Sequence, residues 1–303
     1  MAKDGGGADE VLARLSGVQK RYGETIALAG LDIEVRAGEL LAVLGPNGAG
    51  KTTAIALMLG LQRPDAGEVQ LFGRSPYELS ARRGVGVMMQ EVMLPDALKV
   101  RELIAMTSAY YPDPLPLAET VALSGVAKIA DRPYVKLSGG QKRQAQFALA
   151  ICGRPRLLFL DEPTTGLDVN ARETMWATLR GLVAGGTSIV LTTHYIEEAQ
   201  ALADRVVVMA KGRGVAEGTV AEMRAVVVRK RVDCVTALEL SAIVAWPEVT
   251  AATRDGAVVS ITTAEAEIVV RQLLAADPAL ADLEVRRAGL SEAFAELTQE
   301  PAQ

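Results

Sequence analysis

Gly45-Pro46-Asn47-Gly48-Ala49-Gly50-Lys51-Thr52-Thr53 is the stretch that decides the fold of this 303-residue chain. It follows the pattern G-x-x-x-x-G-K-T, with a further threonine directly behind it. The apolar run Leu40–Leu44 before it is typical of a buried parallel strand, and Ala54–Leu61 after it carries helix formers. A strand, a glycine-rich loop and a helix in this order predict an α/β fold with a phosphate-binding loop.

The chemistry of this loop depends on its backbone as much as on its side chains. Glycines let successive N–H groups turn toward one point, and the following helix presents its positive end to the same point. Lys51 would then reach the β and γ phosphates of a nucleotide, and the Thr52 hydroxyl would be a ligand of Mg²⁺. A plain glycine-rich turn before a helix is the alternative, but the flanking strand and helix favour nucleotide binding.

Composition limits the class of protein. Half of the residues are apolar, 23% are charged and the net charge is -5, which indicates a globular protein without the basic excess of a general nucleic-acid binder. Cys152 and Cys234 lack metal-ligand spacing and are typical of a reduced, cytoplasmic protein. No stretch reaches the roughly 18 to 20 apolar residues that span a bilayer, and the first residues do not form a signal peptide. Any action on a membrane is therefore expected to need a partner.

Several apolar runs end in polar residues, and open α/β sheets bind ligands at the carboxyl ends of their strands. Leu157–Leu160 leads into Asp161 and Glu162, which we interpret as a Mg²⁺ ligand and as the base that activates a water molecule. Gln90 follows a predicted strand and is placed to touch the metal or its water. His194, the only histidine, follows another and is placed near a γ phosphate. Taken singly, Gln90 could equally be a loop residue and His194 a packed one.

Between residues 91 and 154 the strand pattern gives way to helical periodicity, which predicts a helical insertion. Its helices are expected at Val100–Tyr110, Leu117–Ser124 and Gln141–Ile151. The last helix begins at Leu137-Ser138-Gly139-Gly140-Gln141, where exposed N–H groups offer a second place for a phosphate to bind. Taken alone, this stretch is only a capped helix.

The segment before the phosphate loop predicts an antiparallel lead-in, because Val11–Val18 and Leu31–Val35 show short alternating apolar runs. Tyr22 lies at the tip of this lead-in. Its ring is placed to stack on a purine, and the alternative is a simple turn residue. The remaining pattern predicts strands at Val69–Phe72, Val85–Met89, Ser188–Thr193 and Val206–Met209, helices at Tyr77–Arg82, Arg172–Val183 and Ile196–Ala203, and a turn at Gly212–Gly214.

As a set, these motifs resemble the ATP-binding subunit of ATP-binding-cassette (ABC) transporters, over about residues 9–220. The sequence LSGGQ, at Leu137–Gln141, is close to diagnostic of that family. The resemblance assigns adenine stacking to Tyr22, the Walker A loop to Gly45–Thr53, the Q-loop to Gln90, Walker B to Asp161 and Glu162, the D-loop to Gly166-Leu167-Asp168 and the switch histidine to His194.

The resemblance implies a P-loop ATPase that binds ATP and Mg²⁺ and pairs head to tail with a second cassette. Each ATP would lie between Walker A of one chain and Ser138, Gly139, Gly140 and Gln141 of the other, with Asp168 nearby. One kind of chain suffices for such a pair, although a heterodimer is an alternative. The resemblance also implies an integral membrane permease as partner, a place on the cytoplasmic face of the membrane, and no nucleic-acid partner.

Residues 221–303 read as a separate, smaller α+β domain. We predict strands at Ala225–Val235 and Leu283–Arg287, a hairpin over Val249–Thr262 and helices at Ala237–Trp246, Ala264–Ala276 and Ser291–Leu297. The order βαββαβ is typical of a ferredoxin-like unit. The ending Leu283–Phe294 resembles the tail of ATPase subunits of ABC-2-type exporters of drugs, antibiotics and polysaccharides. A ligand-sensing domain, as in some amino-acid importers, and a dimer-stabilising or solvated appendage are the alternatives.

The leading hypothesis is thus an ATPase that powers ABC-2-type export through a separate permease. The alternatives are an importer ATPase whose carboxyl-terminal domain senses substrate, and a soluble ABC ATPase that acts on ribosomes or DNA. One phosphate loop, one signature and the lack of a heptad stretch count against the soluble class.

Overall fold

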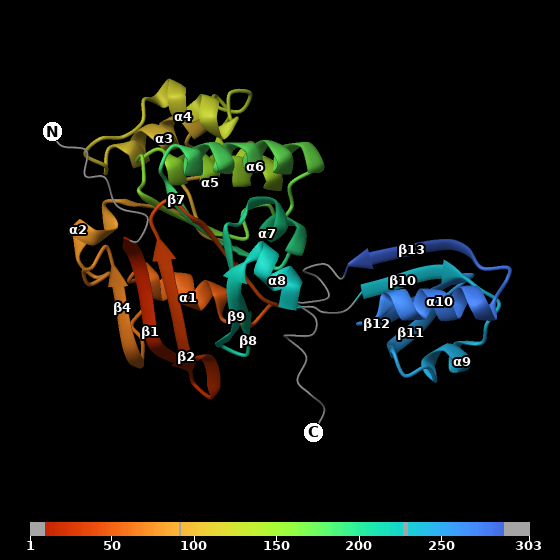
Figure 1. Cartoon of the computed structure of the whole chain (residues 1–303). Coiled ribbons are helices and arrows are strands. Elements are labelled where there is room, and N and C mark those ends of the chain that lie inside the picture. The colour runs from red at the N-terminus through yellow and green to blue at the C-terminus, as the bar shows by residue number, and fades with distance from the viewer. Residues whose placement is uncertain (1–9, 91, 227–229, 288–303) are drawn as a thin grey trace. The chain divides into compact units, whose positions relative to one another are not determined.

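The computed structural model describes residues 10–90, 92–226 and 230–287 (Figure 1). The chain divides into two compact units, Met1–Val220 and Ala221–Gln303. Each unit has its own sheet structure and its own apolar core.

A six-stranded sheet forms the centre of the first unit. Its order is β5 (Val85–Met88), β6 (Leu157–Asp161), β7 (Ser188–Thr193), β3 (Leu40–Leu44), β8 (Arg205–Ala210) and β9 (Arg213–Thr219). The first five strands are parallel and β9 runs antiparallel to β8. Every residue of β3, β6 and β7 is buried, which explains their nearly continuous apolar sequences.

The predicted turn at Gly212–Gly214 is wrong in part, because Arg213 and Gly214 already belong to β9. This strand has a largely exposed sequence, RGVAEGT, without the apolar alternation that marks a half-buried strand. Backbone pairing with β8 stabilises this strand, and such pairing leaves no mark in the hydrophobic pattern of the sequence.

An antiparallel sheet of three strands packs against helix α1 (Lys51–Met58). Within it, β1 (Val11–Tyr22) lies between β2 (Thr25–Arg36) and β4 (Ala66–Leu71). The hairpin of β1 and β2 turns at Gly23, whose φ is 59°, so the predicted lead-in is present and its strands are longer than predicted.

Helices surround the six-stranded sheet (Figure 1). The described residues between β5 and β6 supply α3 (Val100–Ser108), α4 (Leu117–Ser124) and α5 (Gly139–Ile151), which share a core of their own around Leu103, Ile104 and Ala148. The other helices of the unit are α2 (Leu79–Arg82), α6 (Val169–Ala184) and α7 (Ile196–Leu202). None of the helices in the described residues is long and apolar enough to cross a lipid bilayer.

The second unit is a two-layer arrangement with an antiparallel sheet in the order β11-β12-β10-β13. Its elements follow one another as β10 (Lys230–Val235), α9 (Leu240–Val244), β11 (Val249–Asp255), β12 (Val258–Thr263), α10 (Ala266–Ala276) and β13 (Ala281–Arg287). Alternate residues of β10 and β12 face a core that they share with α10, including Val232, Ile261 and Leu273.

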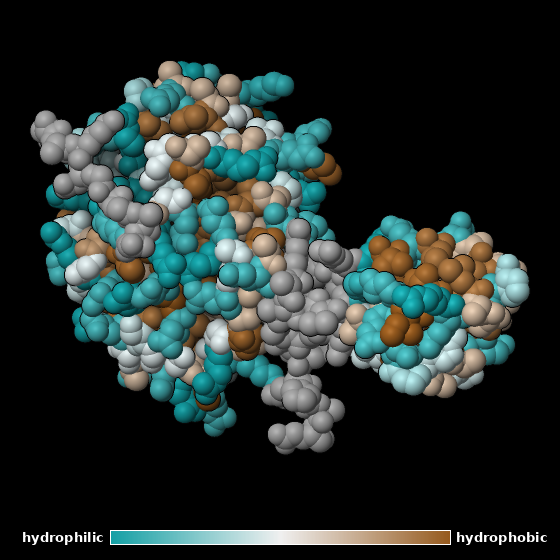
Figure 2. All heavy atoms as spheres, in the orientation of Figure 1, coloured by the Kyte–Doolittle hydropathy of each residue, from teal (hydrophilic) through white to brown (hydrophobic). Residues whose placement is uncertain are grey.

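The first strand of this unit starts later than predicted. A strand predicted to begin at Ala225 is wrong there, because residues 220–226 form helix α8 (Val220–Val226) and β10 begins only at Lys230. The predicted helix over 291–297 lies outside the described residues. Apolar side chains stay on the surface of the unit, with Leu274 57% and Val285 48% exposed, and hydrophobic atoms gather on its visible face (Figure 2).

Candidate nucleotide site

The glycine-rich loop joins the carboxyl end of β3 to the first turn of α1, which begins at Lys51. Gly50 has a φ of 101°, and a Cβ placed there would lie 2.5 Å from the carbonyl oxygen of Ala27. Both the left-handed backbone and the close approach of β2 therefore require glycine. The first turn of α1 carries no acidic residue, so the positive end of the helix is open to an anion.

Lys51 is buried at the base of this loop, with only 5% of its surface exposed. Its Nζ donates to the carbonyl oxygens of Gly45 at 2.7 Å and Pro46 at 3.1 Å, and lies 3.8 Å from Oε1 of Glu162. Burial lowers the pKa of Lys51, and the carboxylates of Glu162 and Asp161 oppose that shift. A cation held inside the loop that the glycines form is suited to binding phosphate oxygens.

Asp161 ends β6 as a fully buried carboxylate. Its Oδ2 accepts a hydrogen bond from the Thr52 hydroxyl at 2.9 Å, and its Oδ1 accepts one from the Thr192 hydroxyl. Within the described residues, no lysine, arginine or histidine nitrogen lies within ion-pair distance of it. A buried carboxylate without an ionic partner, beside a hydroxyl oxygen, matches the hard oxygen ligands that Mg²⁺ prefers.

Mg²⁺ commonly takes one or two carboxylates and completes its shell with water and phosphate oxygens. The described residues contain no group of three or more histidine, cysteine or acidic side chains that could hold a metal by themselves. Asp161 and Thr52 thus fit an ion that arrives with a nucleotide. Thr192 was not predicted as a site residue, although the Thr192-Thr193 pair directly before His194 was a visible signal.

Glu162 follows Asp161 in a left-handed conformation, with a φ of 48°. Its Oε1 lies 3.0 Å from Nδ1 of His194, and its backbone N–H donates to the Thr192 hydroxyl at 3.2 Å. A carboxylate can only accept, so Nδ1 carries the hydrogen and Nε2 of a neutral ring is left as an acceptor. Donation from Nδ1 of His194 to a phosphate oxygen therefore requires the ring to rotate away from Glu162.

A cavity of about 360 Å³ opens above these groups. Its lining includes Lys51, Gln90 and Glu162 together with Tyr22, which is 46% exposed at the end of β1 and donates its hydroxyl hydrogen to Gln62. The full lining is Tyr22, Thr25, Ile26, Ala27, Asn47, Gly48, Gly50, Lys51, Thr52, Thr53, Gln90 and Glu162. The sequence analysis missed Thr25, Ile26 and Ala27, since only the β1–β2 hairpin brings them to the loop.

The signature residues do not line this cavity. Ser138 caps α5: its hydroxyl accepts from the N–H of Gln141 at 3.3 Å, and the Gln141 side chain accepts from the N–H of Ser138 at 3.1 Å. Asp168 caps α6 and accepts from the N–H of Ala171 at 2.8 Å. Within one chain these residues are helix caps, and Gly139 and Gly140 offer the first N–H groups of α5.

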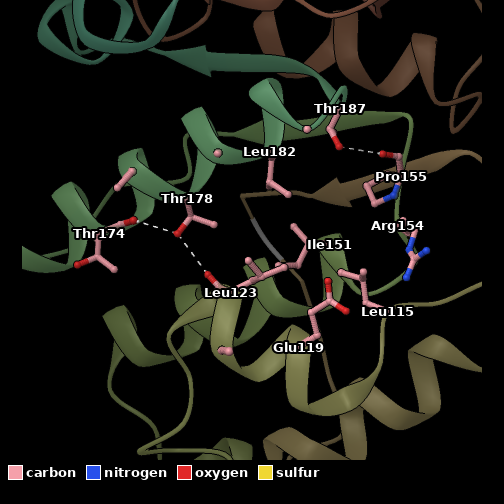
Figure 3. Close-up of a pocket in the computed structure, with 14 residues that line it drawn as sticks. Leu115, Glu119, Leu123, Ile151, Arg154, Pro155, Thr174, Thr178, Leu182 and Thr187 are labelled. Carbon is pink, nitrogen blue, oxygen red and sulfur yellow. Dashed lines mark hydrogen bonds between the residues drawn. The ribbon is translucent and has the colours of Figure 1, made fainter. Parts of the chain in front are cut away.

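A second hollow, of about 780 Å³, lies apart from the predicted site residues. Figure 3 shows it between Glu119 and Leu123 of α4 and Thr174, Thr178 and Leu182 of α6. One hydrogen bond crosses it, from the Thr178 hydroxyl to the carbonyl oxygen of Leu123 at 3.2 Å. The helical insertion is thus separated from α6 by open space over much of this face.

Comparisons with known proteins agree with this geometry. Residues 28–165 match the sequence family described as ABC transporter. The chain is 44% identical over 208 residues to Nod factor export ATP-binding protein I of Burkholderia orbicola, which covers 66% of the chain and 68% of the relative. It is 38% identical over 306 residues to daunorubicin resistance ATP-binding protein DrrA3 of Streptomyces coeruleorubidus, covering 94% and 95%.

Solved structures show the same fold in the first unit. An ATP-binding subunit of an ABC transporter superposes with a TM-score of 0.65 at 26% identity, over 71% of this chain and 92% of that one. The cbiO1 subunit from Clostridium perfringens, part of an ABC transporter complex, gives a TM-score of 0.62 at 26% identity, over 72% and 92%. With the phosphate loop, the paired acids and the signature in place, this chain belongs to the ABC transporter family, as an ATP-binding subunit with ATPase chemistry.

Proposed function

We propose that this chain hydrolyses ATP to power an ABC-2-type exporter through a separate membrane permease. The observation that carries the chemistry is the meeting of Lys51, Thr52 and Glu162 around one cavity, with Asp161 buried behind it and hydrogen-bonded to Thr52. Export is supported by the names of the Nod factor and daunorubicin resistance relatives. The second of these is similar along nearly the whole chain, second unit included.

In this proposal the phosphates of ATP bind the N–H groups of the loop and the ammonium of Lys51. To reach the phosphates, Lys51 gives up its hydrogen bonds to the carbonyls of Gly45 and Pro46. The adenine stacks on Tyr22 at the open end of the cavity. Thr52 and Asp161 hold Mg²⁺, which supplies charge neutralisation for the transferred phosphoryl group. Gln90 contacts the same ion or its water. The loop residues are Gly45, Pro46, Asn47, Gly48, Ala49, Gly50, Lys51, Thr52 and Thr53.

Glu162 is the general base in this proposal. Its carboxylate lies at the lining of the cavity and can accept the proton of a water that attacks the γ phosphate in line. His194 holds that carboxylate through Nδ1 and turns to the phosphate when ATP is bound. Nζ of Lys51 lies 3.8 Å from Oε1 of Glu162, on the same side of the cavity.

The signature residues complete the site of a second copy. The N-terminus of α5 lies outside the cavity of its own chain and carries Ser138, Gly139, Gly140 and Gln141. Asp168, at the start of α6, also lies outside that cavity. A head-to-tail homodimer would bring the α5 N-terminus of one chain to the γ phosphate held by the other. ATP then joins the two chains, and hydrolysis releases them.

Docking of a permease is supported by apolar side chains that remain exposed beside the sheet. Leu61 is 59% and Leu79 63% exposed, and Tyr77 joins these segments by donating to the carbonyl oxygen of Gln62 at 2.8 Å. Exposed apolar side chains close together suit a protein partner. The chain would therefore sit on the cytoplasmic face of the membrane, and the hollow between α4 and α6 leaves the helical insertion room to move.

We propose that the second unit is a ferredoxin-like domain. Its βαββαβ order and its sheet order β11-β12-β10-β13 support this assignment. The exposed Leu274 and Val285 favour contact with another protein surface over a purely solvated appendage. Substrate sensing in an importer is the competing role for this unit.

The test is to trap the Glu162→Gln chain with ATP, together with its genomic neighbours, and to identify what co-purifies from detergent-solubilised membranes. Co-purification of a polytopic membrane protein of the export type is the expected result. Glu197→Gln, an exposed glutamate on α7, serves as the matched control and should not be trapped. A substrate-binding import system, ribosomes, or no partner would overturn the proposed role in export.

A further inference from the structure

Arg143 is a buried cation that the ATPase chemistry described so far does not use. It lies on α5, two residues beyond the signature, and only 8% of its surface is exposed. Burial lowers the pKa of its guanidinium, and the nearby carboxylates of Asp161 and Glu162 oppose that shift. A buried guanidinium is costly unless every donor finds an acceptor, so its partners show what the side chain was placed to hold.

Those partners are backbone carbonyls at the ends of two strands. One terminal nitrogen, Nη1, donates to Met89 at 3.0 Å, to Gln90 at 3.2 Å and to the side chain of Gln146 at 3.1 Å. The other, Nη2, donates to the carbonyl oxygens of Asp161, at 3.0 Å, and of Glu162. Neither nitrogen forms an ion pair with a carboxylate in the described residues.

The four carbonyls form two pairs, and each pair flanks the Cα of one residue. The carbonyls of Asp161 and Glu162 belong to the two peptide groups on either side of the Glu162 Cα. The carbonyls of Met89 and Gln90 belong to those on either side of the Gln90 Cα. Holding both neighbouring peptide planes restricts φ and ψ of the residue between them, and so the direction of its side chain. One planar guanidinium therefore holds the backbone of Gln90 and Glu162 together.

Glu162 needs such restraint because its backbone is strained. A φ of 48° in a residue with a Cβ is unfavourable and persists only where the surroundings enforce it. Relaxation to an ordinary conformation would turn the carboxylate away from His194 and from the cavity. The carbonyl bonds from Arg143 oppose that relaxation from the side of α5.

We propose that Arg143 is a positioning residue, which holds the Glu162 carboxylate in its hydrolytic geometry and ties it, together with the backbone of Gln90, to the helix that carries the signature. This inference rests on the proposed role of Glu162 as the base. Arg143 does not line the nucleotide cavity, so it acts on turnover through Glu162. A shift of α5 would reach the base directly through the guanidinium.

The test compares steady-state ATP hydrolysis by the full-length chain carrying Arg143→Gln, Arg143→Lys or, as a matched control, Lys142→Gln. Lys142 is the neighbouring cation on α5, and its ammonium lies 5.2 Å from the ring centroid of Tyr134, away from the carbonyls that Arg143 holds. A displacement of the base by about 1 Å lowers kcat by about 100-fold, with KM for ATP changed less than about threefold. Lysine retains the charge but not the planar fork, so Arg143→Lys should still lose about tenfold in kcat.

A double-mutant cycle with Glu162→Gln separates positioning from general loss of structure. If Arg143 acts through the Glu162 carboxylate, adding Arg143→Gln to Glu162→Gln lowers the remaining activity less than about twofold. A loss that multiplies in that background, a full rescue by Arg143→Lys, or an unchanged kcat in Arg143→Gln would each overturn the inference. Normal turnover in Glu162→Gln itself would instead remove the proposed base. Thermal melts identify a variant that fails to fold, in which case the Lys variant carries the cycle.

Discussion

The Thr192 hydroxyl connects the two acids of the site, and its removal gives a sharp prediction. It donates to Oδ1 of Asp161 and accepts from the backbone N–H of Glu162 at 3.2 Å, and the residue is fully buried. Thr192→Val keeps the shape and removes both interactions, but the Glu162 N–H still donates to the carbonyl oxygen of residue 192 at 3.1 Å, so the bond to Asp161 is the main loss. A hydrogen bond to a charged group contributes about 1.5–3 kcal/mol, and the valine methyl returns about 0.8 kcal/mol through apolar burial. The expected net loss of unfolding free energy is about 1–2 kcal/mol.

Thermal unfolding of the full chain and Mg²⁺-dependent ATP hydrolysis are the two assays. A loss of this size lowers Tm by about 2–8 °C for a unit of this length. Turnover should fall about tenfold, since about 1.4 kcal/mol of positioning energy is lost for the Asp161 carboxylate. Thr192→Ser, which keeps the hydroxyl, should retain turnover within about twofold, and Thr174→Val on the exposed face of α6 should change neither quantity. Equal losses of turnover in the Ser and Val variants would refute this account of the hydroxyl.

Three other predictions concern charged groups of the first unit. Glu162→Gln should still bind ATP but lose about 100- to 10,000-fold in turnover. Light scattering should then show an ATP-dependent dimer. Near-normal hydrolysis would exclude Glu162 as the base. Binding of phosphates should raise the lowered pKa of Lys51. Titration calorimetry over a series of alkaline pH values, in two buffers of different ionisation enthalpy, should therefore detect proton uptake on ATP binding. Lys51→Ala should abolish this uptake and weaken ATP binding about 10- to 100-fold. Identical heats in both buffers would contradict that mechanism. Burial raises the pKa of Glu198 above 4.5, so its contribution to the stability of the folded chain is greatest below that pH and falls as pH rises through the folded pKa. Glu198→Gln can still accept from Trp176. In urea titrations, its unfolding free energy should gain on that of the native chain between pH 5 and pH 8. A difference that does not change with pH would show that Glu198 does not titrate in this range.

Much of the first unit could be predicted because its signals are local. Leu40–Leu44 and Leu157–Leu160 are buried on both faces of a parallel sheet, so their apolar runs alone indicate strands. The glycine-rich loop is similarly self-contained, since Gly50 must be glycine to adopt its φ and to lie against Ala27. Strand β9 was missed because its residues are exposed and its stability comes from pairing with β8.

The site residues divide in the same way. The recognisable motifs follow the ends of strands, and the parallel sheet brings those ends to one edge. These motifs contain Lys51, Asp161, Glu162 and His194. Thr192 and Arg143 lie outside the recognised motifs. Their importance depends on which atoms they reach across the fold.

The sequence by itself determined the chemistry of this protein: a phosphate loop on a strand and helix, two acids at a strand end, and a signature that places it among ABC ATPases. Only the tertiary structure decided how those parts act together. The order of strands in the sheet sets Asp161 beside Thr52. The packing of α5 brings Arg143 to four carbonyls that are distant in sequence. Such contacts depend on directions and distances between elements, which a linear pattern of residues does not contain.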